Sequence, residues 1–313
     1  MKRTILVTAI GGDVGHSILK CLRDRYETLI GCDMKPYPVG MDLVKECFIS
    51  KPAYDSKYCY HLLEQCKKYQ VTHLIPVSEP EIEVMSNNRG LFVENNIKLC
   101  INSEFIIQTC LDKYFTAQRL RKIGLDVPDF YRSEDFYPNG KKHIVKLRQS
   151  CGSKLLKIIT TKEELDEILE NNPDPLIIQE YIDEPQNEYT VGVFSDSNEV
   201  RVIAFKRKLQ SGFTKFVELC NDETIINDAI IAAKQLSLVG SFNIQLRKHD
   251  EKNYIFEINP RLSGTVHFRY LLGFKDVLWW LDLLDDIKID EYKNKYSKAI
   301  GIREMNEKFL YLE

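Results

Sequence analysis

The sequence predicts a mixed fold, in which an α/β domain is followed by an α+β region. Three features indicate this. An apolar run at residues 4–9 is followed by a glycine-containing turn and by apolar residues at helical spacing, as at the start of a βαβ unit. After Asp112 the spacing of predicted strands and helices changes. From Glu188 onward, long strands are expected that should pair antiparallel.

Residues 1–110 are expected to form the first domain. After the first helix, a strand is expected at residues 28–33, then a helix that carries Leu62 and Cys66 on its apolar face, and a strand at residues 73–77. Strands that alternate with helices in this way are typical of a parallel sheet covered by helices on both faces.

Shorter elements are expected after residue 110. A helix at residues 112–123 comes first, and a capping box at Thr161 and Glu164 should start a later one. The strands of this region are expected at residues 143–147, 155–159, 176–180, 188–194, 200–207, 241–247 and 253–259. The last two are separated by a short polar turn, which predicts a hairpin.

Composition argues against several classes of protein. The 313 residues carry 43 Lys and Arg against 46 Asp and Glu, and 44% are apolar, so a globular chain without affinity for nucleic acid is expected. None of the nine cysteines lies in a C-x-x-C motif, which predicts free thiols in a reducing compartment. Lys275, Asp276 and Asp282 interrupt the most apolar late stretch, and no signal-peptide cleavage site follows the first apolar run. The protein is therefore expected to be cytoplasmic and not to cross a membrane.

Polar residues on the predicted hairpin are candidates for a metal site. Asn243 and Gln245 alternate with apolar residues on its first strand, as do Glu257 and Asn259 on its second. Residues two apart on a strand share a face, so all four can converge. Their oxygens suit magnesium that also binds phosphates, and Arg261 nearby could grip phosphate or carboxylate. The alternative interpretation is an outer face in contact with water.

Residues 256–264 (FEINPRLSG) resemble the glutamate-x-asparagine-proline-arginine segment of the ATP-grasp carboxylate-amine ligases. The similarity is to the branch that contains carbamoyl phosphate synthetase large subunits and biotin carboxylases. This resemblance implies that Glu257 and Asn259 hold magnesium or manganese, with Gln245 at the other metal position. It also implies that Arg261 faces the transferring phosphate of ATP.

Further segments occur in the order that the family shows. Lys113, which follows Asp112, resembles a family lysine that binds phosphate oxygens. Lys146 and residues 149–154 resemble the family's second lysine and its phosphate-covering loop, which places Ser153 against the nucleotide. A lysine followed by a turn of small residues offers a point charge and backbone N–H groups to an anion.

The sequence also matches the family at positions that bind the adenosine part of ATP. Residues 178–182 resemble the hinge between the lobes that hydrogen-bonds adenine, with Glu180 and the backbone of Tyr181 and Ile182 at the matching positions. Glu188 matches the glutamate that takes the ribose hydroxyls. Taken singly, each glutamate would be interpreted as a solvated charge at a strand end.

Two residues are candidates on the substrate side. Arg207 ends a predicted strand near the place where relatives carry an arginine for the substrate carboxylate or its acyl phosphate. Its alternative interpretation is an exposed basic strand end. Glu79 follows the strand at residues 73–77, where an open parallel sheet presents ligand contacts.

The resemblance implies a Rossmann-like pre-ATP-grasp domain at residues 1–110 and a two-lobed ATP-grasp domain at residues 111–313. The small lobe would span about residues 111–184 and the large lobe about 185–313, with ATP between them. The implied enzyme uses ATP and magnesium or manganese to activate a carboxylate as an acyl phosphate and join it to an amine. Its partners would be these small molecules. The apolar residues 277–280 suit a homodimer interface or core equally.

Two other functions remain open from the sequence. The turn at residues 11–15, with Asp33 about 20 residues after it, imitates a dinucleotide fingerprint and would suit an NAD(P)-dependent oxidoreductase. Its spacing is G-G-x-x-G, which favours an ordinary βα turn. The third possibility is an ATP-grasp relative that binds ATP without catalysis.

Overall fold

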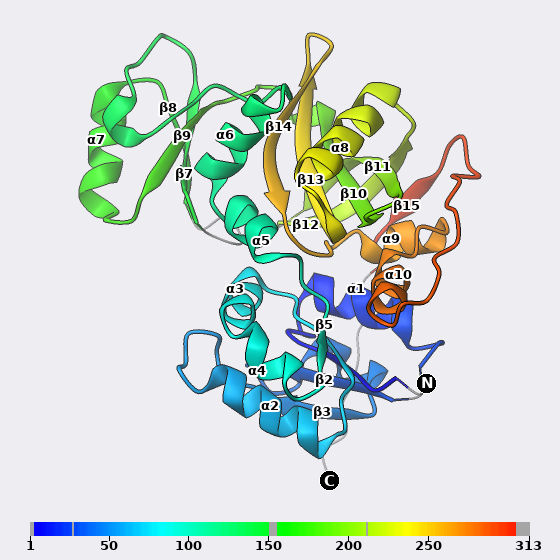
Figure 1. Ribbon diagram of the computed structural model, residues 1–313. Coiled ribbons are helices and arrows are strands. Elements are labelled where there is room, and N and C mark those ends of the chain that lie inside the picture. Colours follow the sequence, from blue (N-terminus) through cyan, green and yellow to red (C-terminus); the bar gives the residue numbers. More distant parts are fainter. Residues whose placement is uncertain (1–2, 27, 150–154, 211, 305–313) are drawn as a thin grey trace.

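The computed structural model describes residues 3–26, 28–149, 155–210 and 212–304. Three sheets occupy separate parts of the molecule (Figure 1). The first sheet is parallel, and the other two are antiparallel. The predicted class, an α/β domain followed by α+β lobes, is confirmed.

The N-terminal sheet has the strand order β3-β2-β1-β4-β5, and all its pairs are parallel. Its strands are β1 (Ile5–Val7), β2 (Leu29–Asp33), β3 (Glu46–Ile49), β4 (His73–Ile75) and β5 (Lys98–Leu99). The helices of this part are α1 (Asp13–Leu22), α2 (Tyr58–Lys68), α3 (Glu79–Asn87), α4 (Arg89–Val93) and α5 (Glu104–Leu111), with a short 3-10 helix η1 (Val39–Leu43).

Both faces of this sheet are buried. Ile5 and Val7 of β1 pack in the cluster that contains the apolar side chains of α1, whereas Leu6 packs with α2 and α3 on the opposite face. A strand covered on both faces needs a continuous apolar run, which is what residues 4–9 show. Gly15 lets α1 approach this layer closely, because a Cβ there would lie 2.4 Å from the carbonyl oxygen of Ala9.

The strand order reverses between β1 and β4, and in open parallel sheets such a point opens a crevice at the carboxyl edge. Asp13 begins α1 after β1, and Glu79 begins α3 after β4. Ser78 and Glu81 form a capping box that starts α3. This helix was not predicted from the sequence. Pro80 lies in its first turn, where proline is tolerated.

The small lobe is built on a sheet with the order β6-β9-β7-β8. Its strands are β6 (Phe130–Tyr131), β7 (His143–Leu147), β8 (Leu156–Ile159) and β9 (Leu176–Glu180), and its helices are α6 (Lys113–Lys122), α7 (Lys162–Asn171) and η2 (Ser133–Asp135). The predicted capping box at Thr161 is confirmed as the start of α7. A separate small core, which includes Val145, Leu165 and Ile178, holds α7 against the sheet.

The large lobe is a six-stranded sheet with the order β14-β13-β10-β11-β12-β15. Its strands are β10 (Glu188–Asp196), β11 (Val200–Gln210), β12 (Phe213–Cys220), β13 (Val239–His249), β14 (Lys252–Asn259) and β15 (Ile300–Ile302). The helices that accompany it are α8 (Glu223–Gln235), α9 (Val266–Leu271), α10 (Asp276–Leu284) and η3 (Pro185–Asn187). The predicted hairpin of β13 and β14 is confirmed.

The N-terminal sheet and the large lobe share one hydrophobic core. Ile5 and Ile18 belong to the same buried cluster as Phe194 of β10 and Trp279 and Trp280 of α10. This shared core fixes the carboxyl edge of the parallel sheet against the inner end of the large lobe. Because Trp279 and Trp280 are buried inside the chain, residues 277–280 form core, and the alternative of a dimer interface there is wrong.

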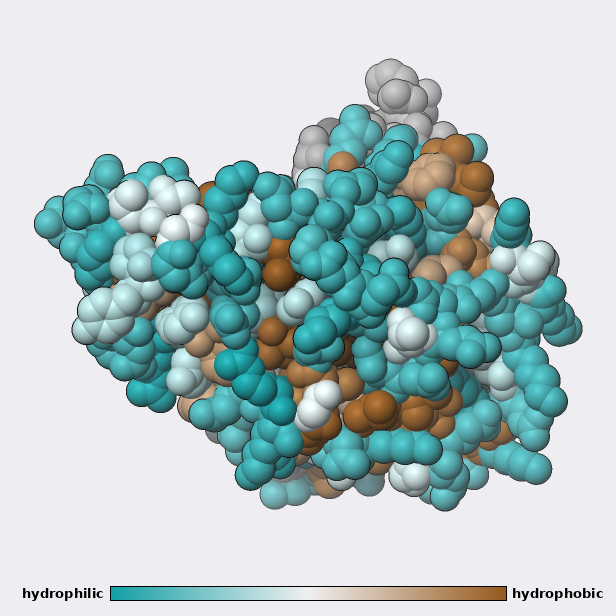
Figure 2. All heavy atoms as spheres, turned by 90° about the horizontal axis from the view of Figure 1, so that it is seen from above, coloured by the Kyte–Doolittle hydropathy of each residue, from teal (hydrophilic) through white to brown (hydrophobic). Residues whose placement is uncertain are grey.

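Seen from above, the surface is mostly hydrophilic, with hydrophobic residues in small separate patches (Figure 2). No helix within the described ranges is both long and apolar enough to span a bilayer. Cys151 lies outside those ranges. The remaining cysteines are all free, as predicted.

Candidate functional site

A cleft of about 470 Å³ lies where the three parts of the chain meet. The small lobe contributes β7 and β9, and the large lobe contributes the inner face of β10, β11, β13 and β14. The N-terminal domain contributes Asp13 of α1 and Glu79 of α3. Every described candidate for binding ATP, the metal or the substrate lines this cleft: Glu79, Lys113, Lys146, Glu180, Tyr181, Ile182, Glu188, Arg207, Gln245, Glu257, Asn259 and Arg261. Ser153 and most of the predicted covering loop lie outside the described residues.

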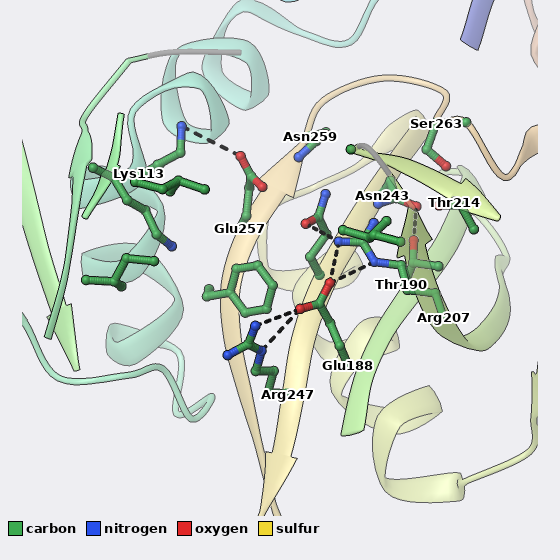
Figure 3. A pocket seen from close by; sticks show the side chains of 18 of the residues that line it. Lys113, Glu188, Thr190, Arg207, Thr214, Asn243, Arg247, Glu257, Asn259 and Ser263 are labelled. Carbon is green, nitrogen blue, oxygen red and sulfur yellow. Dashed lines mark hydrogen bonds and ion pairs between the residues drawn. The ribbon is translucent and has the colours of Figure 1, made fainter. Parts of the chain in front are cut away.

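The polar face of the hairpin forms part of the cleft floor. In the register of β13 and β14, Asn243 stands opposite Asn259, and Gln245 stands opposite Glu257. Asn243 and Asn259 are buried, so the alternative of an outer face in contact with water is wrong. The side-chain oxygen of Asn243 accepts a hydrogen bond of 2.9 Å from Thr190 (Figure 3). Gln245, Glu257 and Asn259 remain the candidate metal ligands, and Oε1 of Gln245 also accepts a hydrogen bond from Arg207.

These three residues fit a cation that is shared with phosphates. They offer one carboxylate and two amide oxygens, and the described residues contain no cluster of three or more His, Cys, Asp or Glu side chains that could enclose a metal alone. Magnesium usually keeps several waters and binds through one or two carboxylates plus substrate phosphates. The buried Nδ2 of Asn259 has no hydrogen-bond partner among the described residues, which is consistent with a ligand that is missing from its surroundings.

Lys113 and Lys146 bring positive charge to the opposite wall. Asp112 caps the first turn of α6 and so fixes Lys113, whose Nζ lies 3.6 Å from a carboxylate oxygen of Glu257. Lys146 of β7 is buried, and its Nζ donates to Oε1 of Gln179 at 2.9 Å and lies 5.1 Å from the centre of the Phe256 ring. Burial lowers the pKa of Lys146 to about 8.

Glu188 lies between two arginines at the centre of the cleft floor (Figure 3). Its Oε1 accepts from Nε and Nη2 of Arg207 at 3.0 and 2.8 Å. Its Oε2 accepts from Nε and Nη2 of Arg247 at 3.1 and 3.0 Å. Nη2 of Arg207 also donates to Oε1 of Gln245 at 2.8 Å. The sequence placed Glu188 and Arg207 in the same site but did not indicate that they pair, and it missed Arg247.

The hinge after β9 closes the far end of the cleft. Oε1 of Glu180 accepts from Nζ of Lys141 at 2.6 Å, and the backbone N–H of Tyr181 donates to the carbonyl of Lys142 at 2.9 Å. The carbonyl of Ile182 accepts from Nη1 of Arg247 at 2.7 Å, so the hinge and the large lobe are directly bonded.

Arg261 joins the large lobe to the N-terminal domain. Its Nη2 donates to Oε1 of Glu79 at 2.9 Å, and its buried Nε has no partner within the described part of the chain. Burial raises the pKa of Glu79, even though the guanidinium of Arg261 acts in the opposite direction. A partly open guanidinium in a cleft that also contains Lys113 is suited to a phosphate or carboxylate.

Comparison with known proteins shows two family matches. Residues 110–265 match the ATP-grasp domain, and residues 5–100 match the PylC-like N-terminal domain. The chain belongs to the ATP-grasp family. This match confirms the resemblance to the ATP-grasp family that residues 256–264 indicated.

Curated proteins resemble this chain in sequence, and solved structures resemble it in fold. The carbamoyl phosphate synthase large chain of Thermotoga neapolitana is 27% identical over 202 residues, which cover 56% of this chain and 18% of that protein. This ATP-grasp chain therefore spans less than a fifth of the length of that relative. The biotin carboxylase domain of Hydrogenobacter thermophilus 2-oxoglutarate carboxylase, solved with MgADP and bicarbonate, superposes with a TM-score of 0.78 at 13% identity, covering 97% of this chain and 75% of that one. The L-amino acid ligase of Bacillus licheniformis gives 0.72 at 15% identity, covering 91% and 75%.

Arg269, which the sequence analysis missed, is fully buried beneath the wall of the cleft and bonds to residues that line it. Nη1 of Arg269 donates to the hydroxyls of Ser263 and Thr265, at 2.8 and 3.1 Å. Its Nη2 donates to Oδ2 of Asp276 at 2.6 Å. Gly192 makes room for it, since a Cβ there would lie 2.9 Å from Cδ of Arg269. Ser263 and Thr265 line the cleft. The ion pair of Arg269 and Asp276 therefore supports the turn at residues 263–265, which follows β14.

The glycine turn of the N-terminal domain is internally bonded. Oδ2 of Asp33 accepts from the backbone N–H of Gly11 at 2.8 Å, and Oδ1 accepts from that of Lys35 at 3.0 Å. Neither Gly11 nor Asp33 lines the cleft. Asp33 therefore stabilises the turn, which favours the interpretation of these glycines as a βα connection over a dinucleotide site.

Proposed function

We propose that this ATP-grasp protein is an ATP-dependent ligase that joins a small-molecule carboxylate to an amine. ATP would lie in the cleft with its adenine at residues 180–182 and its phosphates between the two lobes. The domain limits that accompany this proposal are residues 1–110, about 111–184 and about 185–313. The free and largely buried cysteines support a reducing compartment such as the cytoplasm.

One observation carries the proposal. Buried side-chain donors without partners lie along the cleft, among the described residues, beside the cations Lys113 and Lys146: Nε2 of Gln179, Nδ2 of Asn259 and Nε of Arg261. Buried donors are almost always bonded in native proteins, so these indicate a ligand rich in acceptor oxygens. A triphosphate satisfies donors and cations together. The ligands and names of the relatives, MgADP among them, support the same choice.

The chain's own residues account for the chemistry by position and charge. Gln245, Glu257 and Asn259 would hold magnesium or manganese, which when bound supplies positive charge against the β- and γ-phosphates. Lys113, Lys146 and Arg261 offset the charge that develops as a carboxylate oxygen attacks the γ-phosphorus and ADP leaves. The amine then attacks the acyl carbon, and inorganic phosphate leaves with the bonding electrons. Arg207 binds the acyl phosphate, and no protein nucleophile is required.

Acyl-phosphate formation is the direct test. ATP carrying ¹⁸O in the β,γ-bridge is incubated with the protein and one carboxylate at a time, without an amine. The proposal predicts that at least one carboxylate scrambles the label and that adding an amine releases ADP. Tight ATP binding without scrambling or ADP release across the carboxylate and amine collections would instead support a non-catalytic relative, and binding of NAD in place of ATP would support the oxidoreductase.

The pH dependence of ATP binding should report Lys146. Its free-state pKa lies near 8 because of burial, so the protein loses this positive charge as the pH rises through about 8. Bound phosphate favours the charged form, so ATP affinity is expected to fall above that pH by up to about tenfold per pH unit. Arginine stays charged, so Lys146→Arg should give a flatter profile by calorimetry. Equal slopes in the two proteins would contradict this assignment.

A further inference from the structure

A continuous line of polar contacts runs along the cleft floor from the hinge to the hairpin. The carbonyl of Ile182 accepts from Arg247, Arg247 donates to Glu188, Glu188 accepts from Arg207, and Arg207 donates to Gln245. Each contact measures between 2.7 and 3.0 Å at its closest. The line therefore connects the end proposed for adenine with the end proposed for the metal. Figure 3 shows its middle part, where Glu188 lies between Arg247 and Arg207.

Strand register explains why these side chains meet. Glu188 of β10 stands directly opposite Arg247 of β13, and Thr190 stands opposite Gln245. On the other side, β11 pairs Lys206 with Tyr189, and the same antiparallel register continued by one residue places Arg207 opposite Glu188. Alternate residues of neighbouring strands share one face, so the two guanidinium groups approach the carboxylate from opposite sides.

Glu188 has no acceptor capacity left in this arrangement. An ionised carboxylate offers about four lone-pair sites, and four guanidinium N–H groups already occupy them, two on each oxygen. The residue is 9% exposed, so water does not compete freely for these contacts. A ribose hydroxyl can donate to Glu188 only after one arginine has been displaced, which would leave a buried guanidinium without its counter-charge.

We propose that Glu188 is a positioning residue that holds Arg207 and Arg247 in the cleft, and that it does not accept the ribose hydroxyls. Glu188 anchors Arg207 through Nε and Nη2, which leaves Nη1 outside these bonds and available to an acyl phosphate. Arg247 bonds both the hinge and Glu188, so the same carboxylate fixes the approach of the two lobes at the base end. This inference rests on the proposed ATP-dependent function and changes the role that the family resemblance implies for one residue.

The test combines nucleotide binding with a direct view of the arginines. ATP and 2′,3′-dideoxy-ATP are titrated calorimetrically into wild type and Glu188→Gln, which keeps the side chain's shape and removes its charge. In ¹⁵N-labelled protein, the Nε–H signals of Arg207 and Arg247 are assigned with Arg207→Lys and Arg247→Lys. Thermal unfolding confirms that each variant is folded.

The expected result has two parts. The ratio of ATP to dideoxy-ATP affinity should agree within about threefold between wild type and Glu188→Gln, because the residue does not read the sugar. The Nε–H groups of both arginines should exchange slowly with water in wild type, with and without ATP, and quickly in Glu188→Gln. A purely structural role for Glu188 would leave both signals slow in the folded variant.

Several results would overturn the inference. One is a preference of wild type for ATP over dideoxy-ATP that disappears in Glu188→Gln. Another is slow exchange of both arginines in that variant. If Glu188→Gln does not fold, wild type still decides, because a ribose acceptor must release an arginine when ATP binds, and the freed Nε–H would then exchange quickly. If wild type binds no ATP at all, the proposed function fails, and the exchange rates alone decide the positioning role.

Discussion

The Glu257→Gln variant is expected to form ADP at least about 100-fold more slowly than wild type, with whichever carboxylate and amine support turnover. Glu257 supplies the one carboxylate of the Gln245, Glu257 and Asn259 set, and its Oε1 also lies 3.6 Å from Nζ of Lys113. Glutamine keeps the shape and loses the charge that attracts a divalent ion. Because the ion and Lys113 both depend on this charge, the dependence of the rate on magnesium concentration should shift to higher concentration as well.

Glu251→Gln is the matched control for this prediction. Glu251 lies in the turn of the same hairpin, with a side chain that is 95% exposed. The Glu251→Gln substitution removes an equal charge from the same hairpin, but away from the cleft. The rate of ADP formation and its dependence on magnesium should therefore stay at wild-type values. An unchanged rate of ADP formation in Glu257→Gln would contradict the assignment of the metal site to the hairpin.

The Asp276→Ala variant is expected to lower the free energy of unfolding by about 3–5 kcal/mol, the usual cost of removing one partner from a buried ion pair. Both Arg269 and Asp276 are fully buried, and Oδ2 of Asp276 accepts from Nε and Nη2 of Arg269 at 3.0 and 2.6 Å and from Ser241 at 3.1 Å. Without the carboxylate, a guanidinium remains charged in the interior. Urea denaturation followed by circular dichroism measures the change.

Asp24→Ala serves as the control for the buried pair. Asp24 has a side chain that is 81% exposed and lies 3.5 Å from Arg23, and such surface pairs contribute little. Its unfolding midpoint should match wild type. Equal stability of Asp276→Ala and Asp24→Ala would mean that Arg269 is held by its other contacts and that the pair does not support the turn at residues 263–265.

Local sequence patterns were sufficient to predict the parallel sheet and the hairpin, whereas most of the predicted cleft residues came from the family resemblance, and Arg247 was missed. The alternation of Asn243 with Gln245 and of Glu257 with Asn259 specifies one face of a β-ribbon, and one face of a ribbon is enough to predict that four side chains converge. The edge strand β3 was missed because its residues are only partly buried or exposed and show no clean alternation.

Contacts between residues that are distant in the sequence could not be predicted from local patterns. Glu79 and Arg261 are 182 positions apart, and they meet only because the N-terminal sheet and the large lobe share a core. Similarly, the pairing of Glu188 with Arg247 depends on the register of β10 against β13, which spacing along the chain does not specify. No local pattern singles out Arg269, which is completely buried.

Calorimetric titration of wild type with ATP and magnesium tests the central claim most directly, with the Lys113→Ala/Lys146→Ala double variant as the comparison. ATP should bind with a dissociation constant between about 1 µM and 1 mM, the usual range for enzyme substrates. Binding should weaken at least about 100-fold in the double variant, because both phosphate-facing charges are lost. Absence of ATP binding to wild type, or equal affinity in the two proteins, would contradict the assignment of this cleft to a magnesium-bound triphosphate.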